Sequence, residues 1–142
     1  MRNINAETSQ RNIHPTILTM PTSIKNILKC KPGYKVTGSL WMEFEGERFF
    51  GPGRVELLQL IEETGSLNKA AQQMGMSYKK AWEMVTALNT QAARPLVLLQ
   101  AGGKKGGGSS ITEEAKTLIA YHASLRERFN AFLEKETQNL QP

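Results

Sequence analysis

The sequence predicts a mainly α fold with a small β component (α+β), arranged as one domain with tails. Three observations favour this class. Two stretches with helical spacing follow each other across one glycine, between Ser66 and about Ala93. A β-prone apolar run and a glycine-rich loop come next, and a long amphipathic stretch begins at Thr112. Of the 142 residues, the part from Tyr34 onward is long enough for one modest core.

Residues 1–33 are expected to form a basic, flexible N-terminal arm. This segment carries five lysines and arginines against one glutamate, and its first twenty residues are polar without a sustained period. A short helix could begin after Pro21, Thr22 and Ser23, with three apolar side chains on one side: Ile24, Ile27 and Leu28.

A hairpin and a helix are predicted next. Apolar and polar side chains alternate within Val36–Phe50, the period of a half-buried strand; the apolar set is Leu40, Met42 and Phe44. Gly46 supplies the turn. Gly51, Pro52 and Gly53 are expected to separate the hairpin from the next element. Arg54–Thr64 then has helical spacing, and its core face is made of Val55, Leu57, Leu58, Leu60 and Ile61.

Two helices joined by a tight turn follow. Ser66 is a good N-cap residue for the first helix, which has one apolar face made of Leu67, Ala70, Ala71 and Met74. Gly75 is expected to end this helix, because the position after a helix often needs positive φ. Ser77 caps the second helix, predicted from about Tyr78 to Ala93.

The second helix of the pair carries the candidate binding residues. Its apolar side chains are expected to pack inward: Tyr78, Ala81, Trp82, Val85 and Leu88. Lys79, Lys80 and Glu83 fall elsewhere and can meet solvent or a partner. Two lysines in a first turn oppose the helix dipole, and a phosphate partner would relieve that cost. The alternative is a solvated basic end of an ordinary helix.

A short strand and a basic loop complete this region. Leu96–Leu99 is β-prone and follows Pro95, which marks the end of the helix. Five glycines then surround Lys104 and Lys105, a composition that suits close approach to a phosphate backbone but lacks the P-loop signature. The alternative is a floppy hairpin end. With the helix pair, the pattern predicts a winged helix-turn-helix domain over residues 34–111 that contacts nucleic acid.

The last segment, residues 112–142, is predicted as a long helix and a tail. Five side chains spaced 4-3-4-3 form a coiled-coil-like seam: Leu118, His122, Leu125, Phe129 and Phe132. We expect this seam to pack on a second subunit; the alternative is packing on its own domain. His122 is interpreted as an interface side chain rather than a metal ligand.

The stretch G-S-L-N-K-A-A-Q-Q-M-G-M-S-Y-K-K-A-W-E-M-V-T-A-L-N, with the L-V-L-L strand and the G-G-K-K-G-G-G loop, resembles the N-terminal DNA-binding domain of ModE-type regulators. Those are molybdate-responsive bacterial transcription factors whose winged helix is distantly LysR-like. The likeness covers about Gly51 to the C-terminal helix. It implies a dimer whose recognition helix starts at Ser77. The chain stops at Pro142, so neither the family's C-terminal molybdate domain nor molybdate sensing is expected.

Charge and composition support DNA binding. Ser66–Ile111 holds six lysines and arginines against one glutamate, whereas Tyr34–Gly65 holds three against six. The predicted DNA contacts are Ser77, Tyr78, Lys79, Lys80, Glu83, Lys104 and Lys105. The N-terminal arm either reaches DNA or is a solvated leader that packs on the domain.

The leading hypothesis is a sequence-specific transcriptional regulator that binds an inverted-repeat operator in double-stranded DNA as a homodimer. The alternatives are a winged-helix module for protein–protein interaction and a non-specific architectural DNA binder. An unidentified sensor protein is a further possible partner. With no aspartate and two distant histidines, we expect no enzyme, metal site or cofactor. One cysteine and no long apolar segment favour a cytoplasmic protein without a membrane partner.

Overall fold

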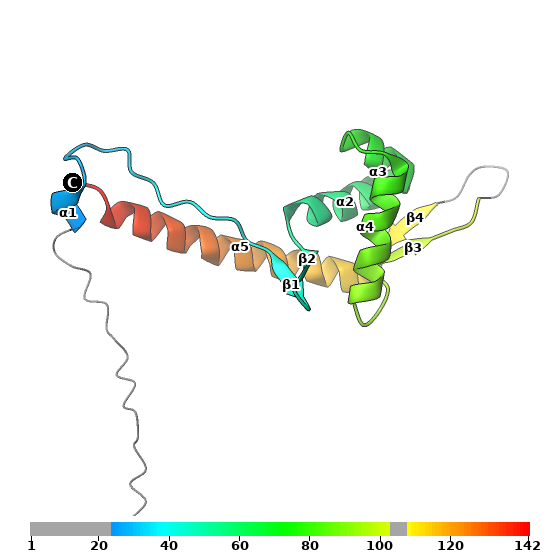
Figure 1. Cartoon of the computed structure of the whole chain (residues 1–142). Helices are drawn as coiled ribbons and strands as arrows, with labels where there is room; N and C mark the ends of the chain where they lie inside the picture. Colours follow the sequence, from blue (N-terminus) through cyan, green and yellow to red (C-terminus); the bar gives the residue numbers. More distant parts are fainter. Residues whose placement is uncertain (1–23, 103–107) are drawn as a thin grey trace, which may run out of the picture.

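The computed structural model describes residues 24–102 and 108–142 (Figure 1). These residues are mainly helical with two small antiparallel sheets, so the predicted α+β class is confirmed. In chain order the elements are α1 (Ile24–Ile27), β1 (Met42–Phe44), β2 (Glu47–Phe50), α2 (Pro52–Thr64), α3 (Leu67–Gln73), α4 (Tyr78–Gln91), β3 (Val97–Leu99), β4 (Ser109–Ile111) and α5 (Glu113–Asn139).

The hydrophobic core lies where α2, α3 and α4 meet the two hairpins and the start of α5. Its largest buried side chains are Phe50, Leu57, Leu58, Ile61, Val85, Leu88 and Val97. Ala70, Ala71 and Ala81 are also fully buried, and their small side chains let α3 and α4 cross closely. The predicted core face of α2 is confirmed, with Val55 and Leu60 only partly buried at its edges.

A proline and a glycine determine where α2 begins and ends. Pro52 occupies the first turn, where a missing N–H costs no hydrogen bond, so the helix begins two residues before the predicted Arg54. The segment from Gly51 to Gly53, expected to separate the hairpin from the helix, therefore contains the start of the helix. Gly65 ends the helix in the left-handed conformation with φ 64°.

The first hairpin is shorter than predicted. β1 and β2 are joined by Glu45 (φ 51°) and Gly46 (φ 81°), the two positive φ values that a tight hairpin turn needs. Gly46 therefore supplies the turn as expected, but Phe44 is 49% exposed rather than inward-facing. Residues 34–41 form no strand; they run as an extended strap beside α5 (Figure 1).

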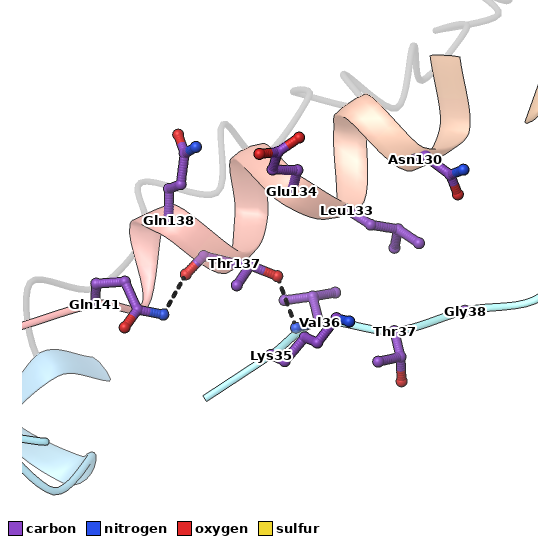
Figure 2. A pocket seen from close by; sticks show the side chains of 10 residues that line it. All are labelled: Lys35, Val36, Thr37, Gly38, Asn130, Leu133, Glu134, Thr137, Gln138 and Gln141. Carbon is purple, nitrogen blue, oxygen red and sulfur yellow. Dashed lines mark hydrogen bonds between the residues drawn. The ribbon is translucent and has the colours of Figure 1, made fainter. Parts of the chain in front are cut away.

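The strap, residues 34–41, is held by specific contacts with the C-terminal half of α5 and with Gln141 just beyond it. The Val36 N–H donates to Thr137 Oγ1 at 2.9 Å, and Gln141 Nε2 donates to the Tyr34 carbonyl at 3.1 Å. Figure 2 shows the strap opposite Leu133 and Thr137 of the helix. A Cβ built on Gly38 would lie 2.9 Å from the Phe129 ring, so this crossing depends on glycine.

The long last helix begins after Thr112, as predicted, with the Thr112 hydroxyl accepting from the Ala115 N–H. However, part of the predicted seam packs within its own subunit. His122 is only 3% exposed, and its ring packs edge-on against Phe50 at a centroid distance of 5.5 Å. Phe129 faces the strap. His122 therefore belongs to the core of its own subunit, which differs from the expected interface role.

A membrane-spanning helix was not found: within residues 24–102 and 108–142, no helix combines the length and apolarity that crossing a bilayer requires. The predicted short helix near Ile24 is confirmed as the four-residue α1. None of its residues is buried. Most of the predicted N-terminal arm, residues 1–23, lies outside the described residues.

Candidate nucleic-acid interface

The turn between α3 and α4 sets the position of the candidate binding helix. The Ser66 hydroxyl accepts from the Lys69 N–H at 3.2 Å, and the Ser77 hydroxyl accepts from the Lys80 N–H at 3.1 Å, so both predicted N-caps are confirmed. Gly75 has φ 67°, which confirms its role at the end of α3. α4 then runs to Gln91, two residues short of the predicted end.

The exposed surface at the start of α4 is basic and polar. Lys79, Lys80 and Glu83 are all exposed, as expected from the helical period. Within the described residues neither lysine forms an ion pair; the pairs there involve Arg94 and Lys116. Both ammonium groups are therefore free to meet phosphate.

Two apolar residues of α4 are not where the sequence predicted them. Tyr78 is 51% exposed and Trp82 is 46% exposed, whereas Ala81, Val85 and Leu88 are buried. A helix of this width buries one stripe only, and here Met84, half-buried against the core, completes that stripe. The expected inward packing of both aromatic residues is wrong.

A groove lies between the start of α3 and the second hairpin. It has a volume of about 1100 Å³ and is lined on one side by Ser66 and Lys69, on the other by Leu99 and Gln100, and at its end by Tyr78. Lys69 is exposed and adds a third described cation to this side of the molecule. Residues of α3, the β3–β4 hairpin and the first residue of α4 therefore line one groove.

Two polar side chains, which sequence reasoning missed, hold the second hairpin against the helices. Asn89 Oδ1 accepts from the Leu96 and Val97 N–H groups at 2.8 and 3.1 Å, and Asn89 Nδ2 donates to the Val97 carbonyl at 2.9 Å. Ser109 accepts from the Leu67 N–H through its hydroxyl and donates its own N–H to the Gly65 carbonyl. These bonds position the hairpin beside α3 and α4.

The tip of the second hairpin carries the remaining predicted contacts. β3 begins one residue later than predicted, at Val97, and pairs with β4 in antiparallel register from Val97↔Ile111 to Leu99↔Ser109. Lys104 and Lys105 fall in residues 103–107 and lie outside the described residues. Beyond the strands, the Gln100 N–H donates to the Gly108 carbonyl at 2.9 Å.

Among the described residues, no three histidine, cysteine, aspartate or glutamate side chains are grouped to hold a metal ion. His122 is the buried polar side chain among these residues, and within the same residues its Nε2 has no hydrogen-bond partner. Burial lowers the pKa of His122, and the nearby Arg126 charge lowers it further. The ring is therefore held neutral as part of the core.

Comparison with known proteins points first to a class: several curated relatives are named transcriptional regulators. Searched protein-family models give no match. The chain is 36% identical over 87 residues to the molybdenum transport protein ModE of Azotobacter vinelandii, and 40% over 80 residues to the transcriptional regulator ModE of Haemophilus influenzae. It is 35% identical over 80 residues to the DNA-binding transcriptional dual regulator ModE of Escherichia coli K12.

These matches cover 61%, 56% and 56% of this chain, respectively, and 32%, 31% and 30% of the relatives. The resemblance to ModE-type regulators is thus confirmed over more than half of the chain. The matched region spans about a third of the length of those relatives. A solved LysR family transcriptional regulator, VV2_1132, covers 57% of this chain and 26% of its own at 17% identity and TM-score 0.42, a likeness that by itself assigns neither fold nor function.

Proposed function

We propose that this protein is a sequence-specific DNA-binding transcriptional regulator built on a winged helix-turn-helix. In this proposal α4 is the recognition helix, and the β3–β4 hairpin with its loop is the wing. The observation that carries it is the start of α4, where Lys79 and Lys80 are exposed and unpaired among the described residues, beside a groove leading to the hairpin. Similarity to regulators named ModE supports the same function.

The proposed contacts divide into positioning and reading. Lys69 at the groove and Lys104 and Lys105 on the wing supply phosphate contacts, which fix the register without specifying sequence. Lys79 and Lys80 lie at the end of α4 that would enter the major groove, where a lysine can also reach a guanine edge. Glu83, one turn further, can accept from a cytosine amino group.

We also propose that the protein acts as a homodimer through α5. His122 is covered by the core and Phe129 by the strap. The apolar stripe that remains uncovered on α5 is made of Tyr121, Leu125 and Phe132. Tyr121 is 51% exposed and Phe132 is 56% exposed. Twofold pairing of this stripe would set two recognition helices about 34 Å apart, which fits an inverted-repeat operator.

Selection from random duplex DNA, followed by fluorescence anisotropy across a salt series, tests DNA binding. We expect an enriched inverted repeat and binding that weakens steeply with salt. Lys79→Ala with Lys80→Ala should weaken binding to the selected site at least tenfold. The matched control is Lys35→Ala with Lys135→Ala, which removes the same charge from the strap and the C-terminal half of α5, far from α4 (Figure 1).

The outcomes separate the candidate functions. Loss of affinity in the α4 variant alone supports the recognition-helix assignment, whereas equal loss in both variants contradicts it. Binding without an enriched sequence would leave an architectural DNA binder. No binding at low salt would refute DNA binding and leave the protein-interaction module. In the same assay, Lys104→Ala with Lys105→Ala should weaken binding to every duplex and reduce the salt slope by about two.

The dimer is tested by sedimentation of two charge variants of α5. Phe132→Glu places a charge on the free apolar stripe and should convert the dimer to a monomer. Ala120→Glu adds the same charge at an exposed position on another side of the helix and should leave the dimer intact. A dimeric Phe132→Glu protein would show that the copies meet elsewhere, and a monomeric wild type would refute the homodimer.

A further inference from the structure

The recognition helix exposes two large aromatic side chains one turn apart. Tyr78 and Trp82 are separated by four residues, so their side chains are neighbours on the helix surface. Lys79 and Glu83 follow Tyr78 and Trp82 directly in the sequence, and Tyr78 lines the same groove as Leu99 of the hairpin. The buried stripe of α4 is complete without these residues, so their exposure does not reflect an unfinished core.

The other tryptophan, Trp41, differs from Trp82 because its indole ring packs against neighbouring residues. Trp41 packs on Gly51, where a built Cβ would lie only 2.3 Å from the ring, and the Arg48 guanidinium lies 4.1 Å above its centroid. In the described part of the chain, no aromatic ring or guanidinium stacks on Trp82. The free indole face of Trp82 is therefore available to an external partner.

The neighbours of Trp82 favour duplex DNA as that partner. Lys79 and Lys80 make the surrounding surface attractive to a polyanion. Trp82 lies in the second turn of α4, within the part of a recognition helix that reaches base edges. The apolar feature that the major groove offers at this depth is the thymine C5-methyl group, which is absent from the other three bases.

We propose that Trp82, supported by Tyr78, is a specificity-determining residue that recognises a thymine methyl group in the major groove. This inference rests on the proposed function and deepens it by naming what the helix reads. The indole face packs on the methyl group, and the Tyr78 ring covers the outer side of the contact. The lysines hold the helix in register through phosphates and carry no part of this discrimination.

Replacement of thymine by deoxyuridine tests the proposal because it removes only the methyl group. Each thymine of the selected operator half-site is replaced in turn, and the Kd is measured by anisotropy for wild type and Trp82→Ala. In wild type we expect one or two positions where deoxyuridine weakens binding three- to tenfold, the effect of burying about one methyl group. At those positions Trp82→Ala should bind both duplexes equally.

The control variant is Thr86→Ala, which truncates the exposed residue one turn further along α4 and should keep the methyl effect. A methyl effect of the same size in wild type and Trp82→Ala, or no effect at any thymine, would overturn the proposal. Selection of a half-site without thymine would do the same. Absence of any sequence preference is a different result, because it would contradict the proposed function itself.

Intrinsic fluorescence gives an independent readout that does not need the Trp82 variant. The chain has two tryptophans, so Trp41→Phe leaves Trp82 as the sole indole. Binding of the selected duplex should change the emission of Trp82, and the thymine-to-deoxyuridine duplex should change it less. Emission that is identical for free protein, selected duplex and random duplex would place Trp82 outside the interface.

Discussion

Asn89 is the side chain whose loss should most damage the link between α4 and the β3–β4 hairpin. Its amide makes three hydrogen bonds to the backbone of Leu96 and Val97, at 2.8, 3.1 and 2.9 Å. Leu96 and Val97 are 3% and 2% exposed, so water cannot readily replace these partners. We therefore predict that Asn89→Ala is strongly destabilising, although Asn89 itself is only half-buried.

The magnitude follows from the number of bonds. A hydrogen bond contributes about 0.5–1.5 kcal/mol net, and three of them give about 1.5–4.5 kcal/mol. Two buried N–H groups are also left without an acceptor, which places the expected loss near the upper end of that range. Asn89→Asp keeps the acceptor for both N–H groups but loses the donor to the Val97 carbonyl, so its cost should be smaller.

Urea unfolding followed by circular dichroism measures both variants. Thr90→Ala is the matched control, because Thr90 is the next residue of α4 and its hydroxyl bonds only to the Thr86 carbonyl within the same helix. Its expected cost is below about 0.5 kcal/mol. If Asn89→Ala costs no more than Thr90→Ala, or less than Asn89→Asp, the Asn89 bonds do not hold the β3–β4 hairpin and the reasoning is wrong.

Two further predictions concern the packing around Phe50. Gly51→Ala should destabilise by about 1–3 kcal/mol, because the new Cβ would overlap the Trp41 ring, whereas Gly53→Ala meets nothing within 4 Å and should not; urea unfolding compares the two. Burial lowers the pKa of His122 in the folded state, so the unfolded state binds the proton more readily. The stability from neutral His122 should be fully present above its ordinary pKa of about 6.5 and decline as pH falls below it. Urea midpoints measured between about pH 7.5 and 5.5 should therefore fall more in wild type than in His122→Phe, and equal falls would refute the assignment.

Local signals were sufficient to predict the helix pair. Ser66 and Ser77 are short polar residues before apolar periods, and Gly75 tolerates the positive φ that the turn needs, so each signal acts within a few residues. The same holds for Gly46 in the first hairpin. Positions of this kind are predictable because the interaction that uses them is close in sequence.

The errors concern residues whose surroundings come from distant segments. The helical period predicted that Tyr78 and Trp82 are buried on the same face as Ala81. The period alone does not determine how much of that face the other helices cover. His122 shares the spacing of a coiled-coil seam, yet Phe50 of the first hairpin packs on it. Alternation in residues 36–41 resembles a strand, but within residues 24–102 and 108–142 no second strand pairs with this segment, which lies beside α5 instead.

The contacts that α5 makes within its own subunit bear directly on how the proposed dimer would read DNA. The face that contacts the strap, through Phe129 and Thr137, ties α5 to residues that precede β1. That contact orients α5 relative to the core, and the core carries α4. A pair of copies joined through Tyr121 and Phe132 would therefore hold its two recognition helices at a spacing set by contacts inside each subunit. In the proposed dimer, Gly38→Ala, whose Cβ would press on Phe129, should alter the preferred spacing between operator half-sites without touching either the DNA or the partner.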